Sequence, residues 1–167
     1  KEAELVIVGD ERGSSYGAGP KEGTWKDKYL EDISGNYSKD RVHFVGHVGY
    51  NEYIALLQMS SCHIYLTYPF VLSWSMLEAM STGLCVIGSG TSPVTEILSD
   101  GENGMITDFF DYKELANKII EVLADEELRR NIGSKARNKI IDEYSIKACL
   151  PKQIALIEAV RCKILGS

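Results

Sequence analysis

Three polar residues have types and a spacing that could bind a ligand, because they lie where a loop leads into a predicted helix: Ser73, Ser75 and Glu78. Two interpretations of their spacing are open. In the first, Ser75 and Glu78 form a capping box, in which each side chain accepts from the other residue's amide. In the second, free amides at the helix start bind a phosphate, and the carboxylate one turn later accepts hydrogen bonds from two adjacent ribose hydroxyls. The two interpretations are not exclusive.

Apolar segments that alternate with helical segments predict the elements that position this loop. The predicted strands cover residues 5–9, 41–46, 62–67, 84–88 and 105–107. This alternation, with short connections, predicts an α/β fold: a Rossmann-like, doubly wound, mainly parallel sheet with helices on both faces. The first strand is a continuous apolar run, so we expect it to be buried on both faces. Such sheets bind ligands at the carboxyl ends of their strands, which here are the loops after Gly9, Gly46 and Thr67.

Two helices of the second half are predicted from their first residues. Asp111 and Glu114 have the spacing of a capping box and precede one apolar stripe. The stripe consists of Leu115, Ile119, Ile120 and Leu123. A last helix is predicted after Ser145, and its apolar residues cover more than one face, which suggests that a partner surface is missing. These residues are Ile154, Ile157, Val160 and Ile164.

Composition and charge exclude several classes of function. A net charge of −6 over 167 residues argues against a nucleic-acid surface. The apolar runs are too short for a membrane span, and the N-terminus has no signal-peptide core, so we expect a cytoplasmic protein. Four cysteines without a C-x-x-C pair predict free thiols. The three histidines lack the spacing of metal ligands, which predicts structural roles.

A glycine-rich segment, residues 10–24, follows the first predicted strand. It fits neither the phosphate-binding pattern G-x-x-x-x-G-K-S/T nor a G-x-G-x-x-G turn that leads directly into a helix. The mismatch favours a mobile loop over a phosphate-binding loop. A dinucleotide-dependent oxidoreductase needs this glycine fingerprint and also an acidic residue after the second strand, where the chain has Gly46 and His47. The sequence meets neither requirement.

Several ordered motifs carry a family resemblance. They are EAMSTGLCVI at 78–87, PVTEI at 93–97, GENG at 101–104 and VHFVG at 42–46. Together they resemble the C-terminal, donor-binding domain of the retaining glycosyltransferases of family 4, which have the GT-B fold. The similarity covers nearly the whole chain from Leu5 to about Tyr144, in the right order.

The resemblance implies a nucleotide-diphosphate sugar as donor substrate, no required metal or other cofactor, and transfer with retention of configuration. Glu78 falls on the family glutamate that binds the ribose hydroxyls. The loop amides of Ser73, Trp74 and Ser75 would meet the diphosphate and sugar. A further segment would line the base, chiefly through backbone groups: Gly46, His47 and Val48.

The family also implies a larger protein. Residues 1–145 would form the nucleotide-sugar-binding domain, and residues 146–167 a helix that packs on a missing N-terminal acceptor domain. The family's basic pair, which neutralises the diphosphate, would lie upstream of Lys1, so we expect the fragment alone to be inactive. Peripheral membrane association of the full-length enzyme is a further option.

Two departures from the family pattern concern the donor sugar. Family members carry a first glutamate eight residues before the second, in a glutamate-x-phenylalanine-glycine context, and Phe70 and Ser73 replace its glutamate and glycine here. Tyr68, Ser73 and Ser75 are candidates to supply the lost sugar contact. The replacement leaves open an alternative, a degenerate nucleotide-binding or interaction module without transferase activity.

Overall fold

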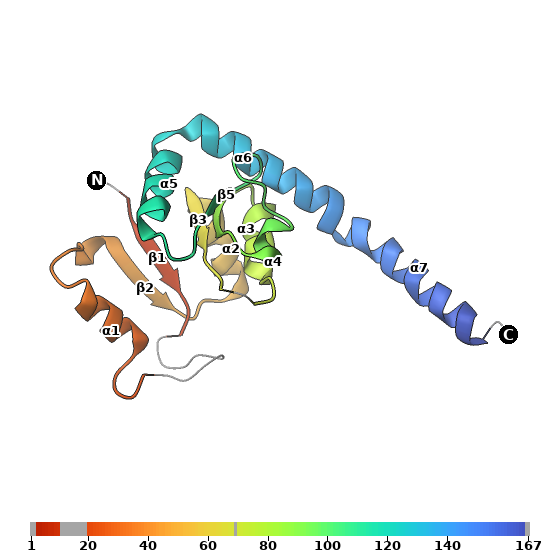
Figure 1. Cartoon of the computed structure of the whole chain (residues 1–167), viewed down its shortest axis with the longest axis horizontal. Helices are drawn as coiled ribbons and strands as arrows, with labels where there is room; N and C mark the ends of the chain where they lie inside the picture. The colour runs from red at the N-terminus through yellow and green to blue at the C-terminus, as the bar shows by residue number, and fades with distance from the viewer. Residues whose placement is uncertain (1–2, 11–19, 69, 166–167) are drawn as a thin grey trace. The chain divides into compact units, whose positions relative to one another are not determined.

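The computed structural model describes residues 3–10, 20–68 and 70–165, and these contain two parallel sheets (Figure 1). The chain divides into two compact units, Lys1–Tyr53 and Ile54–Ser167. The boundary falls inside helix α2 (Tyr50–Met59). Most of the glycine-rich segment predicted to be a mobile loop, residues 11–19, lies outside the described residues.

The N-terminal unit contains a two-stranded parallel sheet and one capped helix. Its elements are β1 (Leu5–Val8), α1 (Trp25–Asp32), the 3-10 helix η1 (Lys39–Arg41) and β2 (Val42–Gly46). Thr24 and Asp27 form a capping box at the start of α1. The prediction that the first strand is buried on both faces is wrong, because its side chains are 38% to 43% exposed. Within this unit β1 pairs with β2 alone, so a two-stranded sheet leaves it partly uncovered.

The C-terminal unit is built on the parallel sheet β3-β4-β5. Its strands are β3 (Cys62–Tyr65), β4 (Cys85–Ser89) and β5 (Met105–Thr107). Its helices are α3 (Trp74–Ser81), α4 (Ser92–Thr95), α5 (Tyr112–Ala124), α6 (Glu126–Lys139), the π-helix η2 (Ile140–Tyr144) and α7 (Ile146–Leu165). Parallel strands alternating with helices confirm the predicted α/β class.

The core of this unit forms around β4, the central strand, whose five residues are all buried. Ile87 of β4 packs with Met105 of β5, Val122 of α5 and Ile132 of α6. The predicted apolar stripe of α5 is only partly inward: Leu115 and Ile119 pack against this cluster, whereas Ile120 is exposed. At about 3.6 residues per turn, Leu115, Ile119 and Val122 lie on one face of α5, so Val122 takes the buried position instead of Ile120.

Helix α7 follows η2 and has Pro151 inside it. Residues 150–163 are exposed throughout, including several large apolar side chains. These are Leu150, Ile154, Leu156, Ile157 and Val160. None of the described helices is both long and apolar enough to cross a lipid bilayer.

Gly133 allows α6 to approach the turn that follows α3 and provides a test of this packing. A Cβ at position 133 would overlap the carbonyl oxygen of Gly83, which is backbone and has no rotamer to change. In an open helix, glycine to alanine would stabilise by about 1 kcal/mol. We expect Gly133→Ala instead to lower the free energy of unfolding by about 1–3 kcal/mol, measured by urea denaturation. Ser134→Ala, at the exposed neighbouring position, is the control, and a more stable Gly133→Ala would contradict the close contact.

Candidate functional site

The loop before α3 is anchored to the end of β3 by hydrogen bonds of Ser73. The Ser73 amide donates to the hydroxyl of buried Tyr65 at 2.9 Å. The Ser73 hydroxyl oxygen, in turn, accepts from the Ser75 amide at 3.2 Å and from the Ser75 hydroxyl at 3.0 Å. Ser73 is therefore the N-cap of α3, and the helix begins at Trp74.

This helix start overturns the predicted capping box of Ser75 and Glu78. Because Ser73 occupies the cap, Glu78 lies in the second turn of α3, beyond the amides that a capping side chain serves. Glu78 is half-buried, and among the described residues no hydrogen bond or ion pair involves its carboxylate. The carboxylate is thus available to a ligand.

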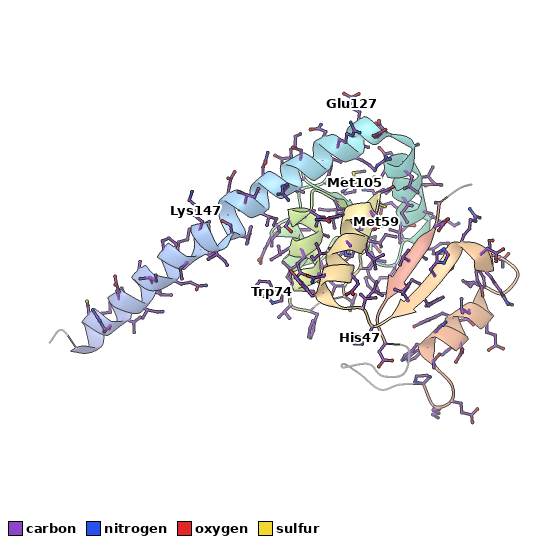
Figure 2. The ribbon with its side chains drawn as sticks, turned by 180° about the vertical axis from the view of Figure 1, so that it is seen from behind. His47, Met59, Trp74, Met105, Glu127 and Lys147 are labelled. Atoms are coloured by element: carbon purple, nitrogen blue, oxygen red, sulfur yellow. The ribbon has the colours of Figure 1, made fainter. Side chains whose placement is uncertain are left out.

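The three predicted loop amides differ in their availability. Those of Ser73 and Ser75 donate within the protein, whereas the structure gives no acceptor for the Trp74 amide among the residues it describes. The Trp74 side chain is 79% exposed and points away from the ribbon (Figure 2). The loop therefore offers a ligand one open amide and one open indole ring.

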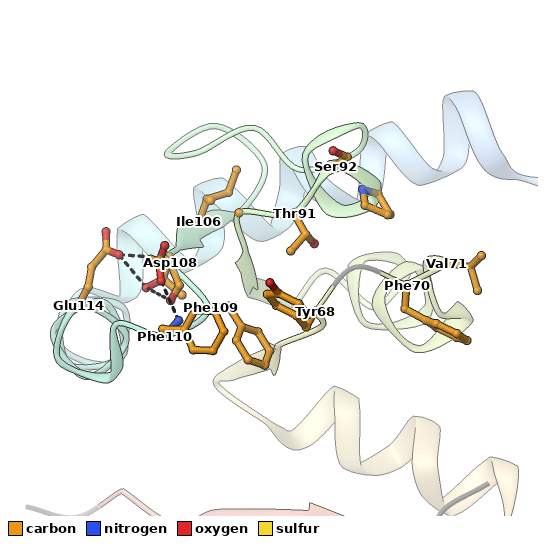
Figure 3. Close-up of a pocket in the computed structure, with 13 residues that line it drawn as sticks. Tyr68, Phe70, Val71, Thr91, Ser92, Ile106, Asp108, Phe109, Phe110 and Glu114 are labelled. Carbon is orange, nitrogen blue, oxygen red and sulfur yellow. Dashed lines mark hydrogen bonds between the residues drawn. The ribbon is translucent and has the colours of Figure 1, made fainter. Parts of the chain in front are cut away.

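A pocket of about 770 Å³ lies at the carboxyl edge of the sheet β3-β4-β5. Its walls come from the segments that leave the three strands: Tyr68, Phe70 and Val71 after β3, residues 90–93 after β4, and residues 106–110 around the end of β5. Glu114 of α5 and Phe70 lie at opposite ends of it (Figure 3). The position agrees with the general rule for ligands of parallel sheets.

Three aromatic rings form one cluster in this pocket. The ring centroid of Tyr68 lies 5.4 Å from those of both Phe109 and Phe110, and these two are 5.0 Å apart. The rings are tilted or edge-on, the arrangement favoured by their quadrupoles. Phe110 is 71% exposed and Tyr68 61% exposed, so the cluster presents ring surface to the pocket.

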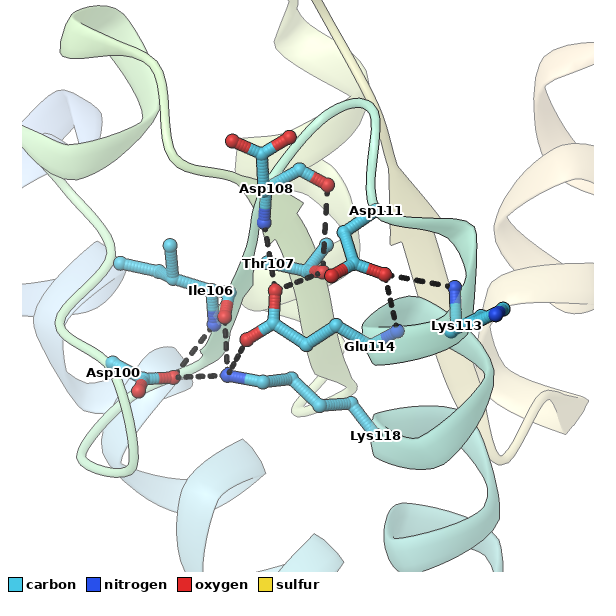
Figure 4. Close-up of polar contacts among 8 residues, drawn as sticks. All are labelled: Asp100, Ile106, Thr107, Asp108, Asp111, Lys113, Glu114 and Lys118. Carbon is cyan, nitrogen blue, oxygen red and sulfur yellow. Dashed lines mark hydrogen bonds and ion pairs between the residues drawn. The ribbon is translucent and has the colours of Figure 1, made fainter.

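Glu114 holds the loop that carries two of these rings (Figure 4). Its carboxylate accepts from the Thr107 hydroxyl at 2.9 Å and from the Asp108 amide at 3.0 Å, and it pairs with Lys118 at 3.6 Å. Asp108 in turn accepts from the Phe110 amide at 2.7 Å. The hydrogen bonds from Asp108 and Thr107 lower the pKa of Glu114 from its ordinary value.

The predicted capping box of α5 is only half formed as a result. Asp111 is the N-cap and accepts from the amides of Lys113 and Glu114 at 3.0 and 2.9 Å. The Glu114 side chain, however, reaches the residues at the end of β5 rather than the Asp111 amide. The Glu114 carboxylate accepts from the Thr107 hydroxyl and the Asp108 amide, so it does not reach back to the cap.

The segment after β3 is held by a buried serine. Ser89 accepts from the Thr67 amide at 3.0 Å, and its hydroxyl donates to the Thr67 carbonyl at 2.8 Å. Tyr68 follows directly, which fixes one wall of the pocket against the end of β4.

The predicted base-binding residues belong to the other unit. Gly46 ends β2 with a positive φ of 67°, His47 is exposed and Val48 half-buried. Their role is a prediction that the geometry of the C-terminal unit does not test.

Buried titratable groups lie away from the pocket, within the sheet. Burial lowers the pKa of His63 and raises the pKa of the Cys85 thiol to about 12, so these are neutral groups of the core at ordinary pH. The described residues contain no group of three or more His, Cys, Asp or Glu side chains placed to hold a metal ion. The cysteines among them are free thiols, as predicted.

Sequence reasoning missed the loop after β5. Asp108, Phe109 and Phe110 line the pocket, whereas only the loops after Gly9, Gly46 and Thr67 were singled out. Two adjacent aromatic residues between two aspartates, at the end of a predicted strand, were the available signal.

Comparison with known proteins identifies the family. A family model described as glycosyl transferases group 1 matches residues 1–139. The chain belongs to this family. An uncharacterized glycosyltransferase of Methanocaldococcus jannaschii is 28% identical over 130 residues, which are 77% of this chain and 33% of the relative. N-acetyl-alpha-D-glucosaminyl L-malate synthase of Bacillus anthracis is 29% identical over 143 residues, or 86% and 34% of the two chains. This group 1 glycosyl transferase chain thus spans about a third of these curated relatives.

Solved structures confirm the expected GT-B type of fold for this glycosyl transferase chain. Anabaena HepE in complex with UDP-glucose has a TM-score of 0.77 and 22% identity, covering 94% of this chain and 41% of HepE. Sucrose-phosphate synthase of Thermosynechococcus elongatus has a TM-score of 0.73 and 24% identity, covering 96% and 39% of the two chains.

The lowered pKa of Glu114 predicts that the stability of the C-terminal unit depends on pH. A carboxylate whose folded pKa lies below its ordinary value of 4.5 stabilises the fold above that value, and the stabilisation is lost as pH falls through the folded pKa. We expect Glu114→Gln to lower the free energy of unfolding at pH 7, and the difference from wild type to shrink below about pH 4.5. Urea denaturation across this pH range measures it.

Glu121→Gln is the matched control, since Glu121 is an exposed carboxylate on the same helix. A Glu114→Gln difference that is the same at every pH would contradict the assigned hydrogen bonds. Faster hydrogen exchange of the Asp108 amide in Glu114→Gln would report the same loss locally.

Proposed function

We propose that this chain is the donor-binding part of a glycosyltransferase that transfers a hexose from a nucleotide-diphosphate sugar to an acceptor, with retention of configuration and without a metal. The observation that carries the proposal is the match of residues 1–139 to the group 1 glycosyl transferases. The fold shared with HepE, whose structure holds UDP-glucose, supports the nucleotide-sugar donor.

The start of α3 supports a donor site in detail. Glu78 has a half-buried carboxylate without a partner among the described residues, and such a group can accept from two adjacent ribose hydroxyls. The Trp74 amide is open, and the dipole of α3 favours a diphosphate near it. Gly46, His47 and Val48 are proposed to contact the base.

The longer relatives support a second domain in the full-length protein. We assign residues 1–145 to donor binding, and residues 146–167 to a helix that packs on an acceptor domain through its exposed apolar side chains. In that assembly positive charge and amide dipoles would stabilise the leaving diphosphate. A cytoplasmic enzyme, with its acceptor in solution or at a membrane surface, fits this proposal. The isolated chain is proposed to bind donor weakly and not to turn over.

A degenerate binding module is the second candidate function. Phe70 stands where the family carries a carboxylate, and its ring lines the pocket. A full-length protein that binds nucleotide yet neither transfers sugar nor hydrolyses the donor would favour this candidate, and sustained turnover would exclude it.

The role of Glu78 can be tested by nucleotide binding. We expect UDP, GDP or ADP to bind the chain, and Glu78→Ala to weaken the preferred nucleotide roughly tenfold or more, because hydrogen bonds to a charged acceptor contribute about 1.5–3 kcal/mol. Isothermal titration calorimetry measures the change. Glu127→Ala removes the same charge from an exposed position of α6 and is the control. Equal affinities of wild type and Glu78→Ala would remove Glu78 from the site.

A further inference from the structure

The pocket at the carboxyl edge of β3-β4-β5 combines aromatic surface with negative charge. Its described lining includes the rings of Tyr68, Phe109 and Phe110 and the carboxylates of Asp108 and Glu114, but no lysine, arginine or histidine. Lys118 pairs with Glu114, so the charge of Asp108 is left uncompensated within the lining. Such a lining repels a phosphate group.

The aromatic cluster is held in place before any ligand arrives. Asp108 holds the Phe110 amide, Glu114 holds the Asp108 amide, and Ser89 holds the segment that leads to Tyr68. The three rings also contact each other in tilted or edge-on arrangements. Exposed rings fixed in this way present a preformed surface, so little conformational entropy is lost on binding.

Two polar groups at the rim have open hydrogen-bonding capacity. One oxygen of Asp108 accepts from the Phe110 amide, and among the described residues the other has no donor. The structure likewise gives the exposed Ser92 hydroxyl no partner in the part of the chain that it describes. Asp108 and Ser92 come from different segments of the pocket wall (Figure 3). A ligand with hydroxyls around an apolar ring face would place that face on the aromatic rings and its hydroxyls near Asp108 and Ser92.

We propose that this pocket binds a neutral pyranose sugar, with its C–H face on Tyr68 and Phe110 and its hydroxyls toward Asp108 and Ser92. The volume of about 770 Å³ suits a ligand of one or two sugar rings. The sugar belongs either to the nucleotide-sugar donor, in which case the inference rests on the proposed function, or to a glycan. Asp108 and Asp111 beside the rings oppose the other use of exposed aromatic residues, docking on an anionic membrane.

The matched pair Phe110→Ala and Tyr112→Ala tests the proposal. Both positions are highly exposed aromatic residues, at 71% and 73%, but only Phe110 lines the pocket. Each variant and the wild type are titrated with UDP, GDP and ADP, with the glucose conjugate of each, and with maltose. Asp108→Asn is a second variant, because it keeps the acceptor for the Phe110 amide and removes the charge. Circular dichroism checks the fold.

We expect Phe110→Ala to weaken a sugar ligand about threefold to tenfold and Tyr112→Ala to leave it unchanged. Selective loss of affinity for the glucose conjugate, with the nucleotide unchanged, assigns the donor sugar. Selective loss of affinity for maltose assigns a glycan as the ligand of the pocket. Asp108→Asn should weaken the same ligand as Phe110→Ala.

Other outcomes overturn the inference. These are wild-type protein that binds no sugar ligand, Phe110→Ala that binds sugars as Tyr112→Ala does, or Phe110→Ala that weakens the nucleotide and its glucose conjugate by the same factor. The proposed function fails separately: if no nucleotide binds while maltose still depends on Phe110, the sugar pocket stands and the donor role does not.

Discussion

The hydroxyl of Ser89 is the contact on which the site depends. β3 and β4 are paired through Tyr65 and Gly88, and beyond that point one buried side chain bonds both backbone polar groups of Thr67. Burial of an unpaired amide and carbonyl would be costly, so these two hydrogen bonds stabilise this path of the chain out of β3. The ends of neighbouring strands stay aligned, and the segments that follow them meet around one pocket.

Two regions of opposite electrostatic character lie along one edge of the sheet in the C-terminal unit. The start of α3 directs the positive end of a helix dipole and the open Trp74 amide outward. The pocket around Asp108 is negative and aromatic. A nucleotide sugar has the same polarity, since its diphosphate is anionic and its sugar is neutral. Phe70 belongs to the loop between the two regions, and its ring lines the aromatic pocket.

Sequence patterns predicted the parts of this fold that depend on local periodicity. The strand over 105–107 and the cap at Asp111 are present as predicted, because an apolar run and an Asx cap need few distant contacts. Exposure of β1 and the side chain of Glu114 were predicted wrongly, because both depend on which neighbours a residue meets in space. The pocket was missed for the same reason: Tyr68 and Phe110 are far apart in sequence and meet only through the register of three strands.

The exposed apolar residues of α7 affect how its sequence can vary. Leu156 and Ile157 are about two-thirds exposed, so polar replacements there remove little buried surface from the unit. A screen for folded, soluble protein would accept them and could even favour them. If such positions nevertheless stay apolar among natural variants, the selection acts on what covers the helix rather than on the stability of the chain that carries it.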